Sequence, residues 1–168
     1  FLNCGIRRSE LVNLNLSDVY EDRIRVIGKG NKERFVYFGS ACRKAIDAYL
    51  PERNQKVLTD NRALFGSRDN NRISVTAVHR LVKKALLQAG LDSTQYSAHK
   101  LRHTAATMML SGGVDVKTVQ EVLGHENLNT TQIYTHIEST ELKIAAEANP
   151  LSKLDFSDKM EDNNDSNQ

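Results

Sequence analysis

The stretch "SAHKLRHTAATMML", residues 97–110, determines one helix of the fold and raises the question of function. Its small and apolar residues recur at helical spacing, which predicts a helix over residues 98–111. His99 and Arg102 share one face with Ala106, so we expect both side chains to project together from the first turn. That turn also carries unpaired backbone N–H groups and the positive end of the helix dipole, and both favour an anion. The residues expected on the buried side are Leu101, Ala105, Met108 and Met109.

The same stretch has one feature of a metal site, because His99 and His103 lie one helical turn apart. Lys100 and Arg102 would repel a cation, however, and the motif contains no Asp or Glu. Zinc peptidase helices carry Glu in HExxH at the position that Lys100 takes here. We therefore favour an anion site. A solvated basic face with one structural histidine would also explain this motif taken alone.

The charge of the chain is distributed unevenly over its 168 residues. Residues 155–168 contain five acidic residues and one lysine, which is a net charge of −4. Because the whole chain has a net charge of +2, residues 1–154 carry a net charge of +6. A basic body fits a polyanionic partner such as nucleic acid, although many domains carry similar charge. The acidic tail is rich in Asn and Asp, and we expect it to be disordered.

The composition is that of a globular domain, with 39% hydrophobic and 26% charged residues. Cys4 and Cys42 are far apart in the sequence and have neither CxxC spacing nor a zinc signature. No apolar run approaches the roughly 20 residues that a membrane span needs. We expect a protein of the reducing cytoplasm, with no membrane partner and no secretory signal.

Hydrophobic periodicity predicts an α+β fold that is mostly helical, with a small antiparallel β-sheet near its N-terminal end. The alternating runs "RIRVI" (23–27) and "RFVYF" (34–38) flank the glycine-rich "GKGNKE", which predicts a β-hairpin with a mobile tip. Residues 6–14 form a rough helical stripe. The other helices are expected at about residues 40–50, 74–89, 98–111, 116–123, 130–136 and 139–147. The expected caps and stops are Gly112, Gly113, Asp115, Gly124 and Asn129.

Several other polar residues have ordinary structural explanations when each is taken alone. Arg7 and Glu10 have the spacing of a surface ion pair on a helix, worth a few tenths of a kcal/mol. Lys29 sits between two glycines, as a solubilising residue in a hairpin turn does. His125 follows a helix-ending glycine, and Tyr134 could be a packed aromatic residue.

The order and spacing of these residues together resemble the tyrosine recombinase (phage integrase) family, and its Xer-like bacterial members in particular. An arginine is followed by a lysine on a hairpin, by H-x-x-R, by Gly-His, and by a tyrosine nine residues later. The matching stretches are "CGIRRSELVNL", "RVIGKGNKERFVYFG", "SAHKLRHTAATMML" and "VQEVLGHENLNTTQIYTH". The resemblance runs from Arg7 to about residue 147. It implies the catalytic-domain fold of that family.

The resemblance also implies catalytic roles for six residues, which are Arg7, Lys29, His99, Arg102, His125 and Tyr134. Arg7 and Arg102 match the two arginines that clamp the scissile phosphate, and guanidinium forks suit phosphate oxygens. Tyr134 matches the nucleophile, which forms a 3′-phosphotyrosyl link and releases a 5′-hydroxyl. A phenol with a pKa near 10 needs a proton acceptor, and His99 matches the histidine in that role. Lys29 matches the lysine that protonates the leaving 5′-oxygen.

The remaining matches concern positioning and DNA contact. His125 matches a second histidine, which donates a hydrogen bond to a phosphate oxygen and positions the tyrosine. Glu10 matches an acidic position that supports the site from behind. We expect His103 to be a bystander that packs or donates a supporting hydrogen bond. Charge alone suggests further contacts to the DNA backbone. These are Lys32, Arg34, Lys100 and Lys117.

The implied function is site-specific DNA recombination or integration. Such an enzyme cleaves and rejoins double-stranded DNA through a 3′-phosphotyrosyl intermediate and a Holliday junction, with no metal, cofactor or ATP. The implied assembly is a homo-tetramer on DNA, or a hetero-tetramer with a paralogue. A segment at 139–154 would dock on a neighbouring protomer in the DNA-bound assembly, and without DNA it would fold back on its own chain or be disordered. A bacterium or a mobile element would encode the protein.

For the domain organisation, we expect residues 1–154 to be the catalytic domain, truncated at its N-terminus, and 155–168 to be the acidic tail. A separate core-binding domain would precede it, and without that domain we expect weak DNA binding and little activity. Three alternatives stay open. A type IB topoisomerase would share this chemistry, a DNA-binding module would lack activity, and a zinc enzyme would use His99, His103 and His125.

Overall fold

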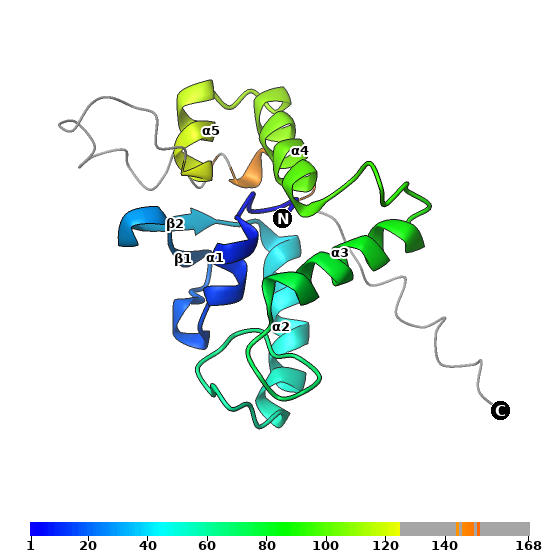
Figure 1. Ribbon diagram of the computed structural model, residues 1–168. Coiled ribbons are helices and arrows are strands. Elements are labelled where there is room, and N and C mark those ends of the chain that lie inside the picture. Colours follow the sequence, from blue (N-terminus) through cyan, green and yellow to red (C-terminus); the bar gives the residue numbers. More distant parts are fainter. Residues whose placement is uncertain (125–143, 145, 150, 152–168) are drawn as a thin grey trace.

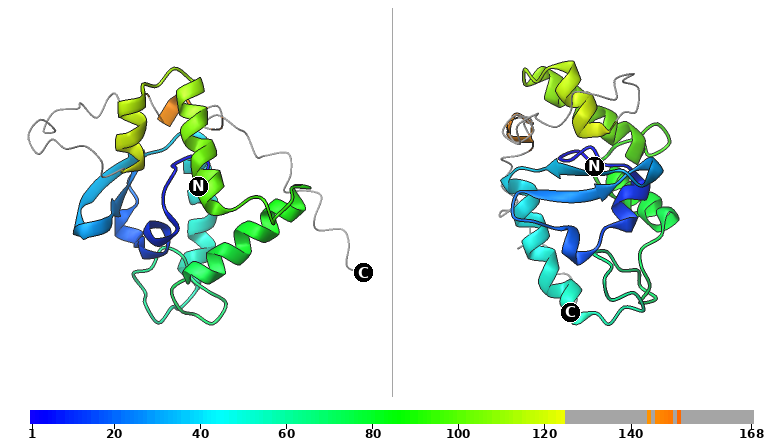
Figure 2. Two further views of the ribbon diagram at one scale, coloured as in Figure 1. Left: turned by 45° about the horizontal axis from the view of Figure 1, so that its top comes forward. Right: turned by 90° about the vertical axis from the view of Figure 1, so that its left-hand side faces the viewer.

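The computed structural model describes residues 1–124, 144, 146–149 and 151 of the chain. A two-stranded hairpin lies between helices, and its tip reaches the edge of the described fold (Figure 1). The helices α4 (Ala98–Ser111) and α5 (Val116–Leu123) lie on one side of the hairpin, and α2 (Ser40–Gln55) lies on the opposite side (Figure 2). The mostly helical α+β fold with a small antiparallel sheet is therefore confirmed. The helices expected near 130–136 and 139–147, and the cap at Asn129, lie wholly or largely outside the described residues.

The predicted hairpin is present, with strand β1 at Arg23–Ile27 and strand β2 at Glu33–Tyr37. The strands are antiparallel, and their register runs from Arg23 opposite Tyr37 to Ile27 opposite Glu33. The second strand begins and ends one residue earlier than expected. The tip of the hairpin is the short 3₁₀ helix η2, Lys29–Asn31, in which Gly30 has a φ of +71°. That dihedral is open to glycine at no steric cost, which explains a glycine at the tip.

Local sequence signals set the ends of most helices. Helix α1 spans Arg8–Asn13, α3 spans Val75–Gln88, α4 spans Ala98–Ser111 and α5 spans Val116–Leu123. A second 3₁₀ helix, η1, spans Leu16–Asp18. Asp115 caps α5 as expected, because its carboxylate accepts hydrogen bonds from two backbone N–H groups of the first turn. Gly112 caps the end of α4, and Gly124 ends α5 with a φ of +64°.

Helix α2 is longer than expected. It spans Ser40–Gln55 and continues past Pro51, where the sequence predicts an end near residue 50. A proline inside a helix costs about 3 kcal/mol, so other contacts must hold the last turn. Arg53 supplies them, because its buried guanidinium donates hydrogen bonds to the carbonyls of Ala63, Asn61 and Lys56. Tertiary hydrogen bonds thus override the local signal.

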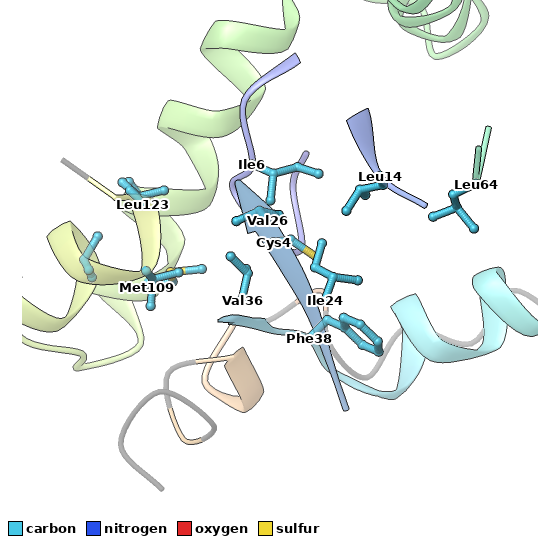
Figure 3. Close-up of a cluster of buried hydrophobic side chains, with 13 residues drawn as sticks. Cys4, Ile6, Leu14, Ile24, Val26, Val36, Phe38, Leu64, Met109 and Leu123 are labelled. Carbon is cyan, nitrogen blue, oxygen red and sulfur yellow. The ribbon is translucent and has the colours of Figure 1, made fainter. Parts of the chain in front are cut away.

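The hydrophobic core joins the hairpin to the helices on its α4 and α5 side. Figure 3 shows Met109 of α4 and Leu123 of α5 close to Val26 and Val36 of the sheet. All four side chains are buried, and Ile6 extends the cluster toward α1. The start of the chain therefore packs between the sheet and the two helices. Within the described residues, no helix is both long and apolar enough to cross a membrane.

The buried face of α4 differs from the expected one. Ala105 and Met109 are buried as predicted, but Leu101 and Met108 are only half-buried. Arg102 takes a place on the buried face, with 7% of its surface exposed, whereas His99 is exposed. The side chains at 98, 102, 105, 106 and 109 form one stripe, so α4 is rotated relative to the expectation. Hydrogen bonds to the guanidinium, described below, allow an arginine to be buried there.

Contacts between residues that are far apart in the sequence also hold the first residues of the chain in place. The Sγ atoms of Cys4 and Cys42 lie 3.8 Å apart, although 38 positions separate the two residues. Asn149 is fully buried and donates hydrogen bonds to the carbonyls of Leu2 and Asn3, at 2.8 and 3.3 Å. The described part of the C-terminal segment therefore packs on the first residues of the same chain.

Truncation of Met109 tests the packing of α4 on the sheet. We expect Met109→Ala to lower the free energy of unfolding by about 2–5 kcal/mol, because it leaves a cavity at a side chain that is 1% exposed. Leu110→Ala is the matched control on the same helix. Its side chain is 42% exposed, so the change should stay within about 0.5 kcal/mol. Urea unfolding of each variant measures both values, and equal losses would contradict this packing.

Candidate active site

Two clefts meet at the start of α1, and both are lined by Arg7 and Ser9. The larger, of about 620 Å³, lies between α1, the tip of the hairpin and the end of α5. The smaller, of about 470 Å³, lies between α1 and the first turn of α4, and His99 and Arg102 line it. Arg7, His99 and Arg102 therefore face one continuous region, although α1 and α4 are far apart in the sequence.

Arg7 is held in place by the helix that it precedes. Its backbone N–H donates to Oε2 of Glu10 at 2.8 Å, and its Nη1 donates to Oε1 of the same carboxylate at 2.9 Å. Its Nη2 donates to the carbonyl of Gly124 at 2.7 Å. The Arg7 side chain keeps 39% of its surface exposed, whereas Glu10 is 3% exposed. The pair is thus not a surface ion pair, because Glu10 is buried behind an arginine that faces the cleft.

Arg102 reaches the cleft from the buried face of α4. Its Nη1 donates to the carbonyl of Gly5 at 2.5 Å, and its Nη2 donates to the carbonyl of Leu123 at 2.7 Å. Burial lowers the pKa of Arg102, and the nearby positive charge of Arg7 lowers it further, to about 10. The group therefore stays cationic at neutral pH. A cation in such a partly desolvated place attracts an anion more strongly than one in open water.

Glu10 is the negative charge behind the two clefts. Its carboxylate accepts hydrogen bonds from Arg34 as well as from Arg7, at 2.8 Å to Oε1 and 3.0 Å to Oε2. Burial by itself would raise the pKa of Glu10. The hydrogen bonds from the two arginines outweigh that effect and lower the pKa to about 2. Glu10 is therefore ionised throughout the physiological pH range.

The C-terminal end of α5 is the second feature that gathers the arginines. Arg7, Arg34 and Arg102 all donate to its last carbonyls, which belong to Val122, Leu123 and Gly124. The final carbonyls of a helix have no partner within the helix and carry the negative end of its dipole. Three cations that would repel one another are thereby held side by side.

The structure places some of the predicted site residues and leaves others outside the described residues. Arg7, Glu10, His99 and Arg102 line the two clefts. Lys29 lies at the hairpin tip, next to Gly28, which lines the larger cleft. His125 and Tyr134 are not among the described residues, so their predicted roles stay predictions. Within the described part of the chain, no three His, Cys, Asp or Glu side chains come together as metal ligands.

Four residues were expected to contact the DNA backbone, and Arg34 differs from the other three in its exposure. Lys32, Lys100 and Lys117 are exposed. Arg34 instead turns inward, with 18% of its side chain exposed, and all three of its nitrogens donate to groups of this chain. The signal was present in the sequence, because period-two alternation puts residue 34 on the same face as the buried Val36. His103 is exposed, so it is not a packing residue.

These features define a mostly helical domain whose cleft presents two arginines and a histidine to an anionic ligand. The chain belongs to the phage integrase family, whose sequence profile matches residues 1–141. It is 55% identical over 154 residues to "Tyrosine recombinase XerC" of Caldanaerobacter subterraneus subsp. tengcongensis, covering 91% of this chain and 44% of that protein. It is 46% identical over 140 residues to the protein of the same name from Corynebacterium glutamicum, covering 82% and 44%.

Solved structures share the fold. The crystal structure of XerA recombinase is similar with a TM-score of 0.69 and 38% identity, covering 84% of this chain and 52% of that one. The XerH site-specific recombinase bound to difH substrate, in a pre-cleavage complex, has a TM-score of 0.66 and 30% identity, covering 87% and 43%. The resemblance to Xer-like tyrosine recombinases is thus confirmed. The chain spans about half the length of the relatives it matches.

Gly124 offers a test of how α5 and Arg34 fit together. A Cβ at this glycine would lie 2.8 Å from Cζ of Arg34, and its φ of +64° strains any other residue. Gly90 is the matched control, because it has a similar φ of +71° and open space around it. We expect Gly90→Ala to lower the free energy of unfolding by about 1–2 kcal/mol, from backbone strain alone. Gly124→Ala should lose clearly more in urea unfolding, and equal losses would contradict the contact with Arg34.

The lowered pKa of Glu10 predicts a pH dependence of stability. A carboxyl whose pKa falls from 4.5 to about 2 on folding stabilises the fold above pH 4.5. That contribution is lost as the pH falls from 4.5 toward 2. We expect Glu10→Gln to flatten the fall of the unfolding free energy in this window, as measured by urea unfolding at several pH values. The exposed Glu52, changed to Gln, is the control, and its variant should keep the steep wild-type slope.

Proposed function

We propose that this chain is the catalytic domain of a site-specific DNA recombinase that cleaves and rejoins strands through a covalent tyrosyl intermediate. The observation that carries the proposal is the meeting of Arg7, His99 and Arg102 around one cleft. The names of the XerC relatives and the XerH structure with its difH substrate support the same function. Because the chain spans about half of the relatives' length, the activity is proposed for the complete gene product that contains it.

In this proposal the two arginines bind the scissile phosphate. Each guanidinium already donates to backbone carbonyls, and each keeps further N–H groups for phosphate oxygens. The phosphate would sit near the first turn of α4, whose free N–H groups and dipole favour an anion. Arg7 and Arg102 would then stabilise the charge that develops on the oxygens of the pentacoordinate transition state.

The chemical step exchanges one phosphodiester bond for another. The phenol oxygen of Tyr134 attacks phosphorus and forms the phosphotyrosyl bond, while the bond from phosphorus to the 5′-oxygen breaks. His99 accepts the phenol proton, and Lys29 donates a proton to the leaving 5′-oxygen. His125 donates a hydrogen bond to a phosphate oxygen. The reverse reaction with a 5′-hydroxyl of another strand rejoins the DNA, so the step needs no ATP.

The wider organisation belongs to the same proposal. Residues 1–154 are the catalytic domain and 155–168 the acidic tail, and a core-binding domain contributes the rest of the grip on double-stranded DNA. Lys32, Lys100 and Lys117 contact the DNA backbone through their charge. Four protomers assemble on DNA to pass through the Holliday junction. The protein acts in the cytoplasm, where the DNA is.

A nicked suicide substrate tests this function. Incubated with the complete gene product, such DNA should trap a covalent protein–DNA adduct that survives a denaturing gel. Tyr134→Phe should form none, because phenylalanine has no nucleophilic oxygen. Tyr20→Phe is the matched control at a tyrosine that packs against Phe35, and it should keep the adduct. An adduct with Tyr134→Phe, or none with the wild type on its own recombination site, would contradict the proposal.

A further inference from the structure

One ion pair behind the cleft has no part in the mechanism above, and it deepens the proposed function. Glu10 and Arg34 form a bidentate pair in which two guanidinium nitrogens meet both carboxylate oxygens, at 2.8 and 3.0 Å. The Glu10 side chain is 2% exposed and that of Arg34 is 18% exposed. Such paired, desolvated groups keep one geometry, because separating them would leave a buried charge without a partner.

The pair contacts three segments that carry or directly precede the predicted catalytic groups Arg7, Lys29 and His125. Glu10 holds Arg7 through two hydrogen bonds. At the hairpin tip, a Cβ on Gly28 would lie 3.6 Å from Nη1 of Arg34, and Gly28 directly precedes Lys29. At the end of α5, Arg34 donates to the carbonyls of Val122 and Leu123 at 3.3 Å, which lie three and two positions before His125.

From these contacts we infer that Arg34 is a positioning residue for the recombination reaction, joining α1, the hairpin tip and the end of α5 into one unit. This inference rests on the proposed function. Its effect on catalysis is geometric, because a displacement of about 1 Å in a reacting group can cost about 100-fold in rate. Arg34 does not need to touch DNA for this role.

Only an arginine fits the role. Its planar fork reaches the carboxylate on one side and helix carbonyls on the other, with donors in fixed directions. A lysine would keep the positive charge but has a single nitrogen, so it could not meet Glu10 and the carbonyls of α5 in the same way. A contact to the DNA backbone has the opposite requirement, since it depends on charge and accepts lysine. The two roles therefore predict different results for Arg34→Lys.

The first experiment needs no DNA and no activity. Hydrogen–deuterium exchange is followed in the complete gene product over the amides at the end of α5 and at the hairpin tip. We expect Arg34→Lys and Arg34→Gln to speed exchange in both segments, while α3 keeps its wild-type exchange. Unchanged exchange at the end of α5 would overturn the inference. This result stands whether or not the protein proves to be a recombinase.

The second experiment measures cleavage and DNA binding separately. At saturating suicide substrate, we expect both Arg34 variants to form the adduct about 100-fold more slowly than the wild type. Their dissociation constants for DNA, and the slope of binding with salt, should stay at wild-type values. Lys32→Gln is the comparison on the same hairpin, because loss of a phosphate contact should weaken binding and reduce the salt slope by about one. A wild-type cleavage rate for Arg34→Lys, or a reduced salt slope, would overturn the inference.

Glu10→Gln tests the same ion pair from its other side, in case the Arg34 variants fail to fold. The amide keeps the shape of the side chain but removes the charge that holds Arg34. We expect it to slow adduct formation in the same way, and the Glu10→Gln/Arg34→Gln double variant to lose no more than the worse single variant. Full additivity of the two losses would contradict a shared role. If the wild type forms no adduct, the proposed function fails, and hydrogen exchange still decides the role of Arg34.

Discussion

The buried carboxylate of Glu10 is the charge on which the arrangement of the site depends. Arg7, Arg34 and Arg102 lie close enough to affect one another, because the two other arginines add to the effect of burial in lowering the pKa of Arg102. Without a compensating anion, three such cations would separate into solvent. Glu10 binds two of them directly, and the carbonyls at the end of α5 bind all three. The cleft thus keeps a net positive character toward solvent, while its charges are balanced from behind.

The sequence predicts most of the fold because local signals decide most of its elements. Alternation and glycines define the hairpin, and Asp115 and Gly124 define the ends of α5. Prediction from local sequence fails where a contact with a distant residue decides the end or the orientation of a helix. Helix α2 continues through Pro51 because Arg53 is fixed by carbonyls of the following loop, and no local pattern carries that information. The buried face of α4 differs in part from the predicted one for the same reason, since Arg102 can be buried only because Gly5 and Leu123 offer carbonyls.

The sequence predicts which residues form the candidate site better than it predicts how their side chains are arranged within it. The resemblance in motif spacing predicts that Arg7, His99 and Arg102 belong to one site, and in the structure all three line the same cleft. The role of Arg34 was assigned from charge alone, as a contact for DNA. Strand alternation would have turned the same residue inward. The charge of Arg34 therefore does not predict where its side chain lies, whereas its position in the period of the strand does.

The carbonyls that hold Arg7 and Arg102 have a further consequence, for the entropy of substrate binding. A free arginine side chain samples many rotamers, and ordering one costs up to about 2 kcal/mol. Here the backbone of Gly5, Leu123 and Gly124 has already restricted both guanidiniums when the chain is folded. A phosphate that enters the cleft meets donors that have little rotational freedom left to lose. The ordering cost is met when the domain folds, so under the proposed function the affinity for a phosphodiester would be higher by that amount.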